Sequence, residues 1–134
     1  MAFPEIQSSI LCEAVRQEEG GKLSILGFRG VLPNLDLAIS EKPKTLVLLN
    51  ILGPHEGGTF MMSAVLRDPR GEIIAAPSNT LLTLQTVPRE QGAFIATNFG
   101  EVVIDKAGSY TFEITADNNL VIKQMFSAFF SPPS

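Results

Sequence analysis

The stretch from residue 108 to residue 130, GSYTFEITADNNLVIKQMFSAFF, has the clearest structural pattern in the chain. Over residues 110–116, apolar residues alternate with polar ones, which is the period of a strand with one buried face. Asn118 and Asn119 follow, and asparagine tolerates the left-handed backbone that a tight hairpin turn requires. The pattern predicts a β-hairpin in which residues 120–130 form the returning strand.

Similar strand signals recur upstream, separated by turns rich in Gly, Pro and Asn. Strands are predicted at residues 22–31, 45–52, 59–67, 72–76, 81–87 and 94–104. The turn at residues 68–71, Asp-Pro-Arg-Gly, joins two of them as a hairpin, and Gly100 predicts a bulge in the last. This spacing favours an all-β, immunoglobulin-like antiparallel β-sandwich of roughly 7–9 strands. We expect one domain that spans residues 1–134.

Composition limits the classes of function. The chain has 134 residues, of which 45% are hydrophobic and 18% charged, with a net charge of −4. The scattered basic residues favour neither nucleic acid nor an anionic membrane as a partner, and no apolar run is long enough to span a bilayer. Cys12 is the single cysteine, so no internal disulfide forms, and no signal peptide is visible. We therefore expect a cytoplasmic or phage-particle-associated protein.

Residues 12–27, CEAVRQEEGGKLSILG, combine a Cys-Glu pair, an Arg-x-Glu and a Gly-Lys that is followed by Gly27. They resemble the first hairpin of an uncharacterised family of small bacterial and phage-encoded β-sandwich proteins, and a weaker likeness extends to residues 108–110. The resemblance implies a strand at residues 6–17, whose apolar spacing on its own fits a helix equally well. It implies no activity. Gly20 and Gly21 are expected to form the hairpin turn.

Residues 105–110, DKAGSY, resemble the corner that precedes a late strand of immunoglobulin-like sandwiches. There a tyrosine hydroxyl bonds back to the nearby backbone and fixes the path of the chain. This resemblance gives Tyr110, the only tyrosine, and Gly108 a structural role.

The only histidine, His55, lies beside Glu56 in the glycine-rich loop 53–58. Neighbouring residues rarely point at one substrate, and no motif places a Ser or Cys nucleophile. A structural zinc site needs four ligands, whereas the chain holds one His and one Cys. We therefore expect no enzyme, metal or cofactor. Two alternatives remain: a small-ligand site that joins His55 and Glu56 to Arg67 or Arg70, and a hydrolase or metal enzyme centred on His55.

Two strands are apolar on both faces, namely residues 46–52, LVLLNIL, and residues 125–130, MFSAFF. In a two-layer sandwich each strand has an outer face, so such strands need a second cover. Either another part of the chain or another protein provides it. The second case predicts a contact surface made of Val47, Leu49, Ile51, Met125 and Phe129. It also predicts that the protein works by contact with a second copy or a docked partner.

Overall fold

The computed structural model describes residues 3–19, 22–84 and 93–130. Their strands are β1 (Ile6–Cys12), β2 (Ala14–Gln17), β3 (Leu23–Leu26), β4 (Gly30–Val31), β5 (Asp36–Ala38), β6 (Lys44–Leu52), β7 (Gly58–Arg67), β8 (Ile73–Ala75), β9 (Thr80–Leu84), β10 (Ala93–Val102), β11 (Gly108–Ala116) and β12 (Asn119–Phe129). There are more strands in the described ranges than the roughly 7–9 expected, because several strands at sheet edges are only two or three residues long.

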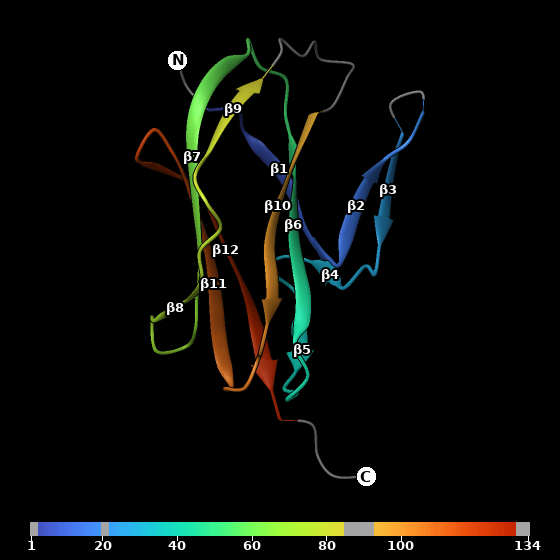
Figure 1. The fold of residues 1–134 in the computed structure, drawn as a ribbon, viewed down its shortest axis with the longest axis vertical. Helices are drawn as coiled ribbons and strands as arrows, with labels where there is room; N and C mark the ends of the chain where they lie inside the picture. Colours follow the sequence, from blue (N-terminus) through green and yellow to red (C-terminus); the bar gives the residue numbers. More distant parts are fainter. Residues whose placement is uncertain (1–2, 20–21, 85–92, 131–134) are drawn as a thin grey trace.

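Two sheets pack face to face, as the two layers in Figure 1 show. The first sheet has the order β10-β6-β1-β4, and the second has the order β5-β12-β11-β7-β8, with β9 also paired to β7. All pairs are antiparallel except β5 with β12. The expected all-β sandwich of mainly antiparallel strands is therefore confirmed.

The core lies between the inner faces of these sheets. Every second side chain of β11 is buried, from Tyr110 through Phe112 to Ile114. The ring of Phe112 packs against Phe99 and Phe126, with centroid distances of 4.9 and 5.6 Å. The alternation seen in the sequence thus marks the residues that join the two layers.

The turn of the last hairpin lies one residue earlier than predicted. The positive φ angles belong to Asp117 (49°) and Asn118 (67°), and Asn119 already pairs with Ala116. The amide of Asp117 donates to the carbonyl of Met61, and the Asp117 carboxylate accepts from the Met61 amide, each at 2.9 Å. These tertiary bonds hold Asp117 in the turn, where aspartate tolerates the left-handed conformation.

Two predicted strands are each split in two. Residues 6–17 are extended, as the family resemblance implied, but they divide into β1 and β2 at Glu13; residues 22–31 divide into β3 and β4 around Gly27. Among the described residues, strands β2 and β3 pair with each other and with no other strand, so they form a separate two-stranded sheet. We call residues 14–26 the arm; Figure 1 shows that it leans away from the first sheet. Gly20, Gly21 and residues 85–87 of the predicted strand 81–87 lie outside the described residues.

Candidate functional site

The expected contact residues do not form one surface. Val47 and Leu49 lie on the outer face of the first sheet, where they are 5% and 0% exposed, and Ile51 beside them is half-buried. Met125 and Phe129 lie on the outer face of the second sheet and are 45% and 44% exposed. The two groups therefore face opposite sides of the sandwich. Val47 and Leu49 are removed from the candidate contact surface, because their cover is already present in the single chain.

The arm lies on the side of the first sheet that carries Val47 and Leu49. Strand β2 contacts β6, and Figure 1 shows β2 and β3 on the side of the first sheet that faces away from the second sheet. Within the arm, Val15 pairs with Ile25 and Gln17 pairs with Leu23, and both Val15 and Leu23 are half-buried. The arm thus supplies part of the cover that the doubly apolar strand β6 requires.

A polar anchor holds the base of the arm. The guanidinium Nη2 of Arg29 lies 3.3 Å from Oε1 of Glu13 and donates at the same distance to the carbonyl of Thr45 on β6. Gly27 has a φ of 62°, and a Cβ there would lie 2.5 Å from Cδ of Glu13. The close approach of Glu13 to the glycine is therefore part of the anchor, and it explains why both predicted strands break here.

Cys12 lies directly before this anchor and is completely buried. Its thiol lies 3.6 Å from the carbonyl of Val47. Burial raises the pKa of the Cys12 thiol, while the amide of Ala14 and the charge of Arg29 act in the opposite direction. A buried thiol with a raised pKa is inert and packs as a small apolar side chain.

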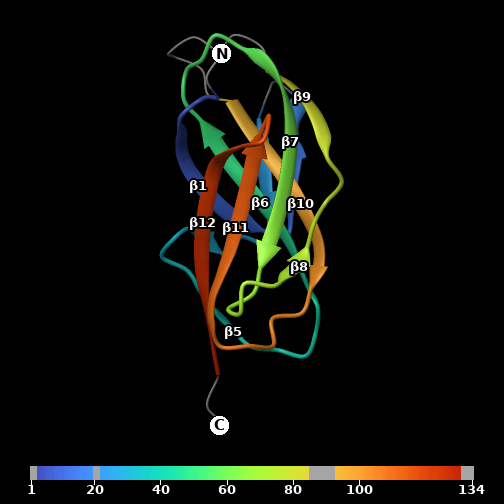
Figure 2. The same ribbon diagram turned by 90° about the vertical axis from the view of Figure 1, so that its left-hand side faces the viewer.

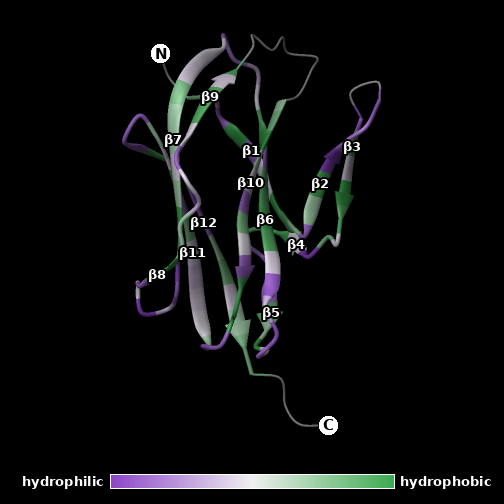
Figure 3. Ribbon diagram, in the orientation of Figure 1, coloured by the Kyte–Doolittle hydropathy of each residue, from purple (hydrophilic) through white to green (hydrophobic). Residues whose placement is uncertain are grey.

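The outer part of the arm and the segment that follows it are apolar and exposed. Figure 3 colours the last residues of β3 as hydrophobic. Ile25, Leu26, Phe28 and Val31 are 36%, 43%, 61% and 46% exposed. We call these four residues the arm surface. The sequence pattern does not predict the arm surface, since it places residues 22–31 in one continuous strand of the sandwich.

The proposed ligand residues do not converge. His55 and Glu56 precede β7, whereas Arg67 ends this ten-residue strand, which at 3.3 Å per residue separates them by roughly 30 Å. Arg67 is bound to Glu113, with 2.5 Å between Nε and Oε1, and Arg70 lies in the turn beyond it. The combination of loop 53–58 with Arg67 or Arg70 is therefore wrong.

His55 is held within its own loop. Its Nδ1 lies 3.0 Å from the carbonyl oxygen of Gly53, which can only accept, so Nδ1 carries the proton. Nε2 is buried and has no hydrogen-bond partner among the residues described. This geometry orients the ring towards the loop backbone. In addition, no three His, Cys, Asp or Glu side chains of the described ranges gather as metal ligands.

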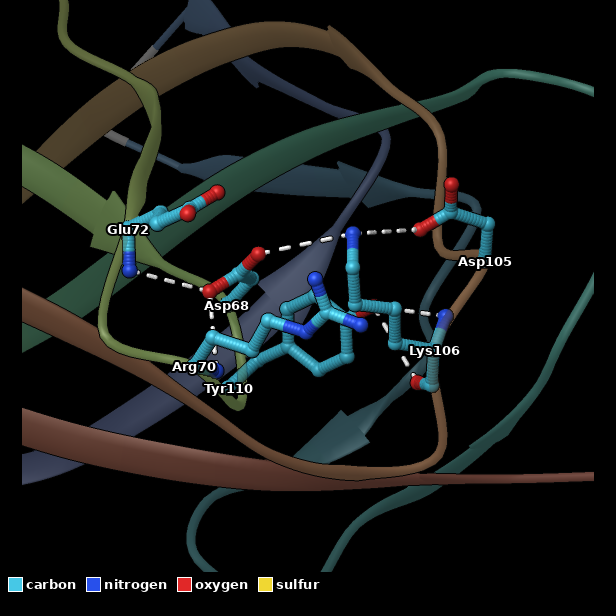
Figure 4. Close-up of polar contacts among 6 residues, drawn as sticks. All are labelled: Asp68, Arg70, Glu72, Asp105, Lys106 and Tyr110. Carbon is cyan, nitrogen blue, oxygen red and sulfur yellow. Dashed lines mark hydrogen bonds and ion pairs between the residues drawn. The ribbon is translucent and has the colours of Figure 1, made fainter.

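A buried carboxylate joins two turns at the end of the sandwich, as Figure 4 shows. Oδ1 of Asp68 accepts the amide hydrogens of Arg70 and Glu72, both at 2.9 Å. Its Oδ2 lies 3.5 Å from Nζ of Lys106, which also contacts Asp105 at 3.3 Å. We call this group the Asp68 corner. It links the β7–β8 turn to the segment before β11.

Tyr110 holds the backbone of Lys106, which belongs to the Asp68 corner. Its hydroxyl donates to the carbonyl of Lys106 at 3.2 Å and accepts from the Lys106 amide at 3.1 Å. Gly108 has a φ of 126°, and a Cβ there would lie 2.9 Å from Cβ of Pro69. The tyrosine and the glycine therefore occupy the structural positions that the corner motif assigns to them.

The charges of the corner stabilise one another. Burial on its own would raise the pKa of Asp68, but the amides of Glu72 and Arg70 and the Lys106 ammonium outweigh it and lower that pKa. The hydrogen bond to Asp105 does most to raise the pKa of Lys106; partial burial opposes this, and Asp68 adds to it. Both groups therefore stay charged at neutral pH. The corner is a structural clamp in which the charges of Asp68, Lys106 and Asp105 are paired.

A cavity of about 380 Å³ opens between the two layers on the side where β10 faces the segment 77–84. We call this side the seam. Ile95 and Thr97 of β10 line the cavity, together with Leu82 of β9 and the core residues Ala64 and Ile114. Its lining comes from β7, β9, β10 and β11 and from Pro77 and Ser78, so no single stretch of sequence indicates it.

Residues 7–127 match the model of a family described as a family of unknown function, DUF6941. No curated protein matches the chain. Among solved structures, the chain is similar to an immunoglobulin-like protein from Pseudomonas aeruginosa, with 15% identity and a TM-score of 0.40 over 96% of this chain and 98% of that chain. In the described ranges, no helix is long and apolar enough to cross a membrane. Because the family match covers nearly the whole chain, the protein belongs to DUF6941, a family of unknown function.

Proposed function

We propose that the protein is a non-enzymatic contact module that binds a second copy of itself through the arm surface. One observation carries the proposal: four large apolar side chains within seven residues are 36% to 61% exposed. Contiguous exposed apolar residues on a folded domain mark interaction sites, whereas single ones are ordinary. Ile25 and Leu26 end β3 and lie on opposite faces of the arm. Phe28 and Val31 follow them along the chain, so exposed apolar side chains gather at this end of the arm.

The arm's place in the fold supports the same conclusion. Strands β2 and β3 form a sheet of their own, outside both sheets of the sandwich. A two-stranded hairpin is at best marginally stable in water and needs an apolar surface to pack against. The first sheet provides this on one side of the arm, where Val47 and Leu49 are buried. A partner that covers Leu26 and Phe28 would complete the packing on the exposed part.

The anchor at the base of the arm favours specific binding. Arg29, the only charged residue between Ile25 and Val31, is engaged by Glu13 and by the carbonyl of Thr45. The Arg29 guanidinium is therefore already engaged within the chain, and the four exposed side chains around it are apolar, which suits contact with an apolar surface. Two-fold symmetric dimers bring the same patch of both copies together, and for this reason we take a second copy as the partner.

Cys12 supports a reducing compartment. It is the single cysteine and is buried as a free thiol, and free thiols persist where disulfides are not formed. We propose a cytoplasmic or phage-particle-associated protein of bacterial or phage origin, with an accessory or structural role.

Sedimentation velocity over a range of protein concentrations tests self-association. The wild type should form a dimer at high concentration, because burial of the arm surface removes apolar area from water. The double variant Leu26→Ser/Phe28→Ser should stay monomeric with an unchanged urea midpoint. Leu120→Ser is the matched control, because Leu120 is 54% exposed on the other sheet, and it should dimerise like the wild type.

A wild type that stays monomeric at every concentration contradicts the proposal. Loss of the dimer in Leu120→Ser but not in the double variant places the contact elsewhere, and also contradicts it.

A further inference from the structure

Strand β10 ends the first sheet with an unpaired edge. In the described part of the chain, β6 is the only strand that pairs with β10. No strand of the described residues is hydrogen-bonded to the other edge of β10, although β8 contacts β10, and Pro77 and Ser78 line the same cavity as residues 95–98. A row of unpaired backbone N–H and C=O groups is a template on which another extended chain adds by main-chain hydrogen bonds.

Natural sheets block such edges, and most edges of this molecule follow that rule. Strands β4, β5 and β8 are only two or three residues long. In β10, the register shifts between Asn98 and Glu101, and Gly100 has a φ of 76°, so a bulge interrupts the lower part of the edge. Residues 93–98, AFIATN, contain no charge, proline or glycine. The upper part of the edge thus lacks the usual protective features.

The cavity of the seam lies beside this part of the edge. Ile95 and Thr97 pair with Asn50 and Leu48, which are both fully buried, so the four side chains share the inner face of the first sheet. Ile95 and Thr97 also line the cavity of about 380 Å³. Figure 2 shows the segment between β8 and β9 running beside β10, and Pro77 and Ser78 of this segment also line the cavity. Strand β9, residues 80–84, TLLTL, borders the same cavity and is also uncharged.

These features together define the chemistry of an occupant. A strand added to β10 directs every second side chain between the layers, where the cavity offers space lined by Ile95, Ala64 and Ile114. A charged side chain placed there would lose its hydration without a partner. A small molecule would fill the cavity but would leave the row of backbone groups on β10 unpaired.

We propose that the seam binds an extended, uncharged segment of another protein, which pairs with residues 93–98 and inserts alternate apolar side chains into the cavity. A second copy fits less well, because the inner side chains of its own β10 already face its own core. The site shares no residue with the arm surface. Self-association through the arm and strand addition at the seam can therefore fail independently.

The test uses a blocked octapeptide that alternates threonine and valine, and a control octapeptide that alternates threonine and glutamate. Amide hydrogen exchange is followed by NMR while each peptide is titrated into the full chain. The threonine–valine peptide should slow exchange at every second amide of residues 93–98, because only alternate amides point to the free edge. The glutamate peptide should leave these rates unchanged.

Three variants locate the site. Thr97→Lys places a charge at the mouth of the cavity and should weaken binding of the threonine–valine peptide by about tenfold or more. Val103→Lys adds the same charge at a residue that is 41% exposed beyond the end of β10, and it should bind as the wild type does. Ala64→Leu fills the cavity from the opposite layer without altering the edge; it should also weaken binding, and it replaces Thr97→Lys if that variant does not fold.

Absence of slowed exchange in the wild type up to millimolar peptide overturns the proposal. Equal binding by the wild type, Thr97→Lys and Ala64→Leu overturns it as well. Protection of residues 93–98 that rises with protein concentration before any peptide is added would identify a second copy as the occupant, and would overturn the assignment to a different protein.

Discussion

The Asp68 corner and the base of the arm both use a carboxylate and a basic side chain to join two segments, but they fix different things. At the corner, Asp68 is 4% exposed and accepts two backbone amides in addition to its ion pair. At the arm base, the side chain of Glu13 is 56% exposed, its carboxylate pairs with Arg29, and its carbon atoms lie against Gly27. The corner is part of the body and stabilises the sandwich, whereas the arm base sets only where the arm lies. The same chemistry therefore supports a rigid body and a separate contact element.

Removal of one large side chain from the body and one from the arm surface should give the largest difference in the free energy of unfolding. Phe112→Ala deletes a ring that is fully buried between Phe99 and Phe126, and should lower the free energy of unfolding by about 3–5 kcal/mol. Phe28→Ala removes an exposed ring and should change it by less than about 0.5 kcal/mol. Urea denaturation measures both. Equal losses would show that the arm belongs to the core.

A buried polar pair inside the body should give the next largest effect. The Ser9 hydroxyl donates to Oδ1 of Asn50 at 2.6 Å, and the two residues are 1% and 0% exposed. Ser9→Ala leaves the Asn50 oxygen without this donor and should cost about 1–3 kcal/mol of unfolding free energy in urea denaturation. Ser8→Ala, at the half-buried neighbour, is the control. A similar loss in both variants would contradict a specific role for the pair.

Two Gly→Ala variants distinguish backbone strain from side-chain crowding, because both glycines have a positive φ but only Gly27 has close neighbours. Gly27→Ala combines a φ of 62° with a Cβ that would lie within 2.8 Å of Cβ of Glu13, whereas Gly71→Ala has a φ of 83° and open space around it. Both should be destabilising, by about 1 kcal/mol from the backbone alone. Only Gly27→Ala should also displace Glu13 from Arg29 and speed amide exchange in the arm. Equal exchange in the two variants would rule out the anchor.

Acid should weaken the Asp68 corner. The pKa of Asp68 is lowered in the folded protein, so its contribution to stability is complete above its unfolded pKa of about 3.9 and is lost as the pH falls through the folded value. Urea midpoints should therefore fall between about pH 5 and pH 2, with a smaller fall in Asp68→Asn. Partial exposure of Lys106 keeps this effect the smallest of the four. The same pH dependence of the urea midpoint in the wild type and in Asp68→Asn would contradict this role of Asp68.

The parts of the fold that were predictable are those fixed by local pattern. Alternation along β7 and β11 gave the buried faces, and the Asp-Pro-Arg-Gly turn gave the pairing of β7 with β8. The turn at Asp117 was displaced by one residue because Met61, which is 56 residues away, binds it. Local residue preferences carry no information about such a partner.

The arm and the seam could not be predicted from the sequence pattern, because both depend on contacts between residues that are distant in the sequence. The strand break at Glu13 depends on its contact with Gly27 and Arg29, although residues 6–17 read as one extended segment. The apolar outer face of β6 suggested an exposed contact that includes Leu49, yet Leu49 is fully buried within the single chain. The cavity at the seam depends on which strands remain unpaired, a property of the whole topology.

Hydrogen exchange of the arm as a function of protein concentration tests directly whether a second copy binds the arm surface. The amides of β3 (Leu23–Leu26) should become more protected as concentration rises, because a second copy covers the arm surface, while those of β11 (Gly108–Ala116) should stay constant. The Leu26→Ser/Phe28→Ser variant should show no concentration dependence. Protection in β3 that is the same at all concentrations in the wild type would contradict the arm as the contact element.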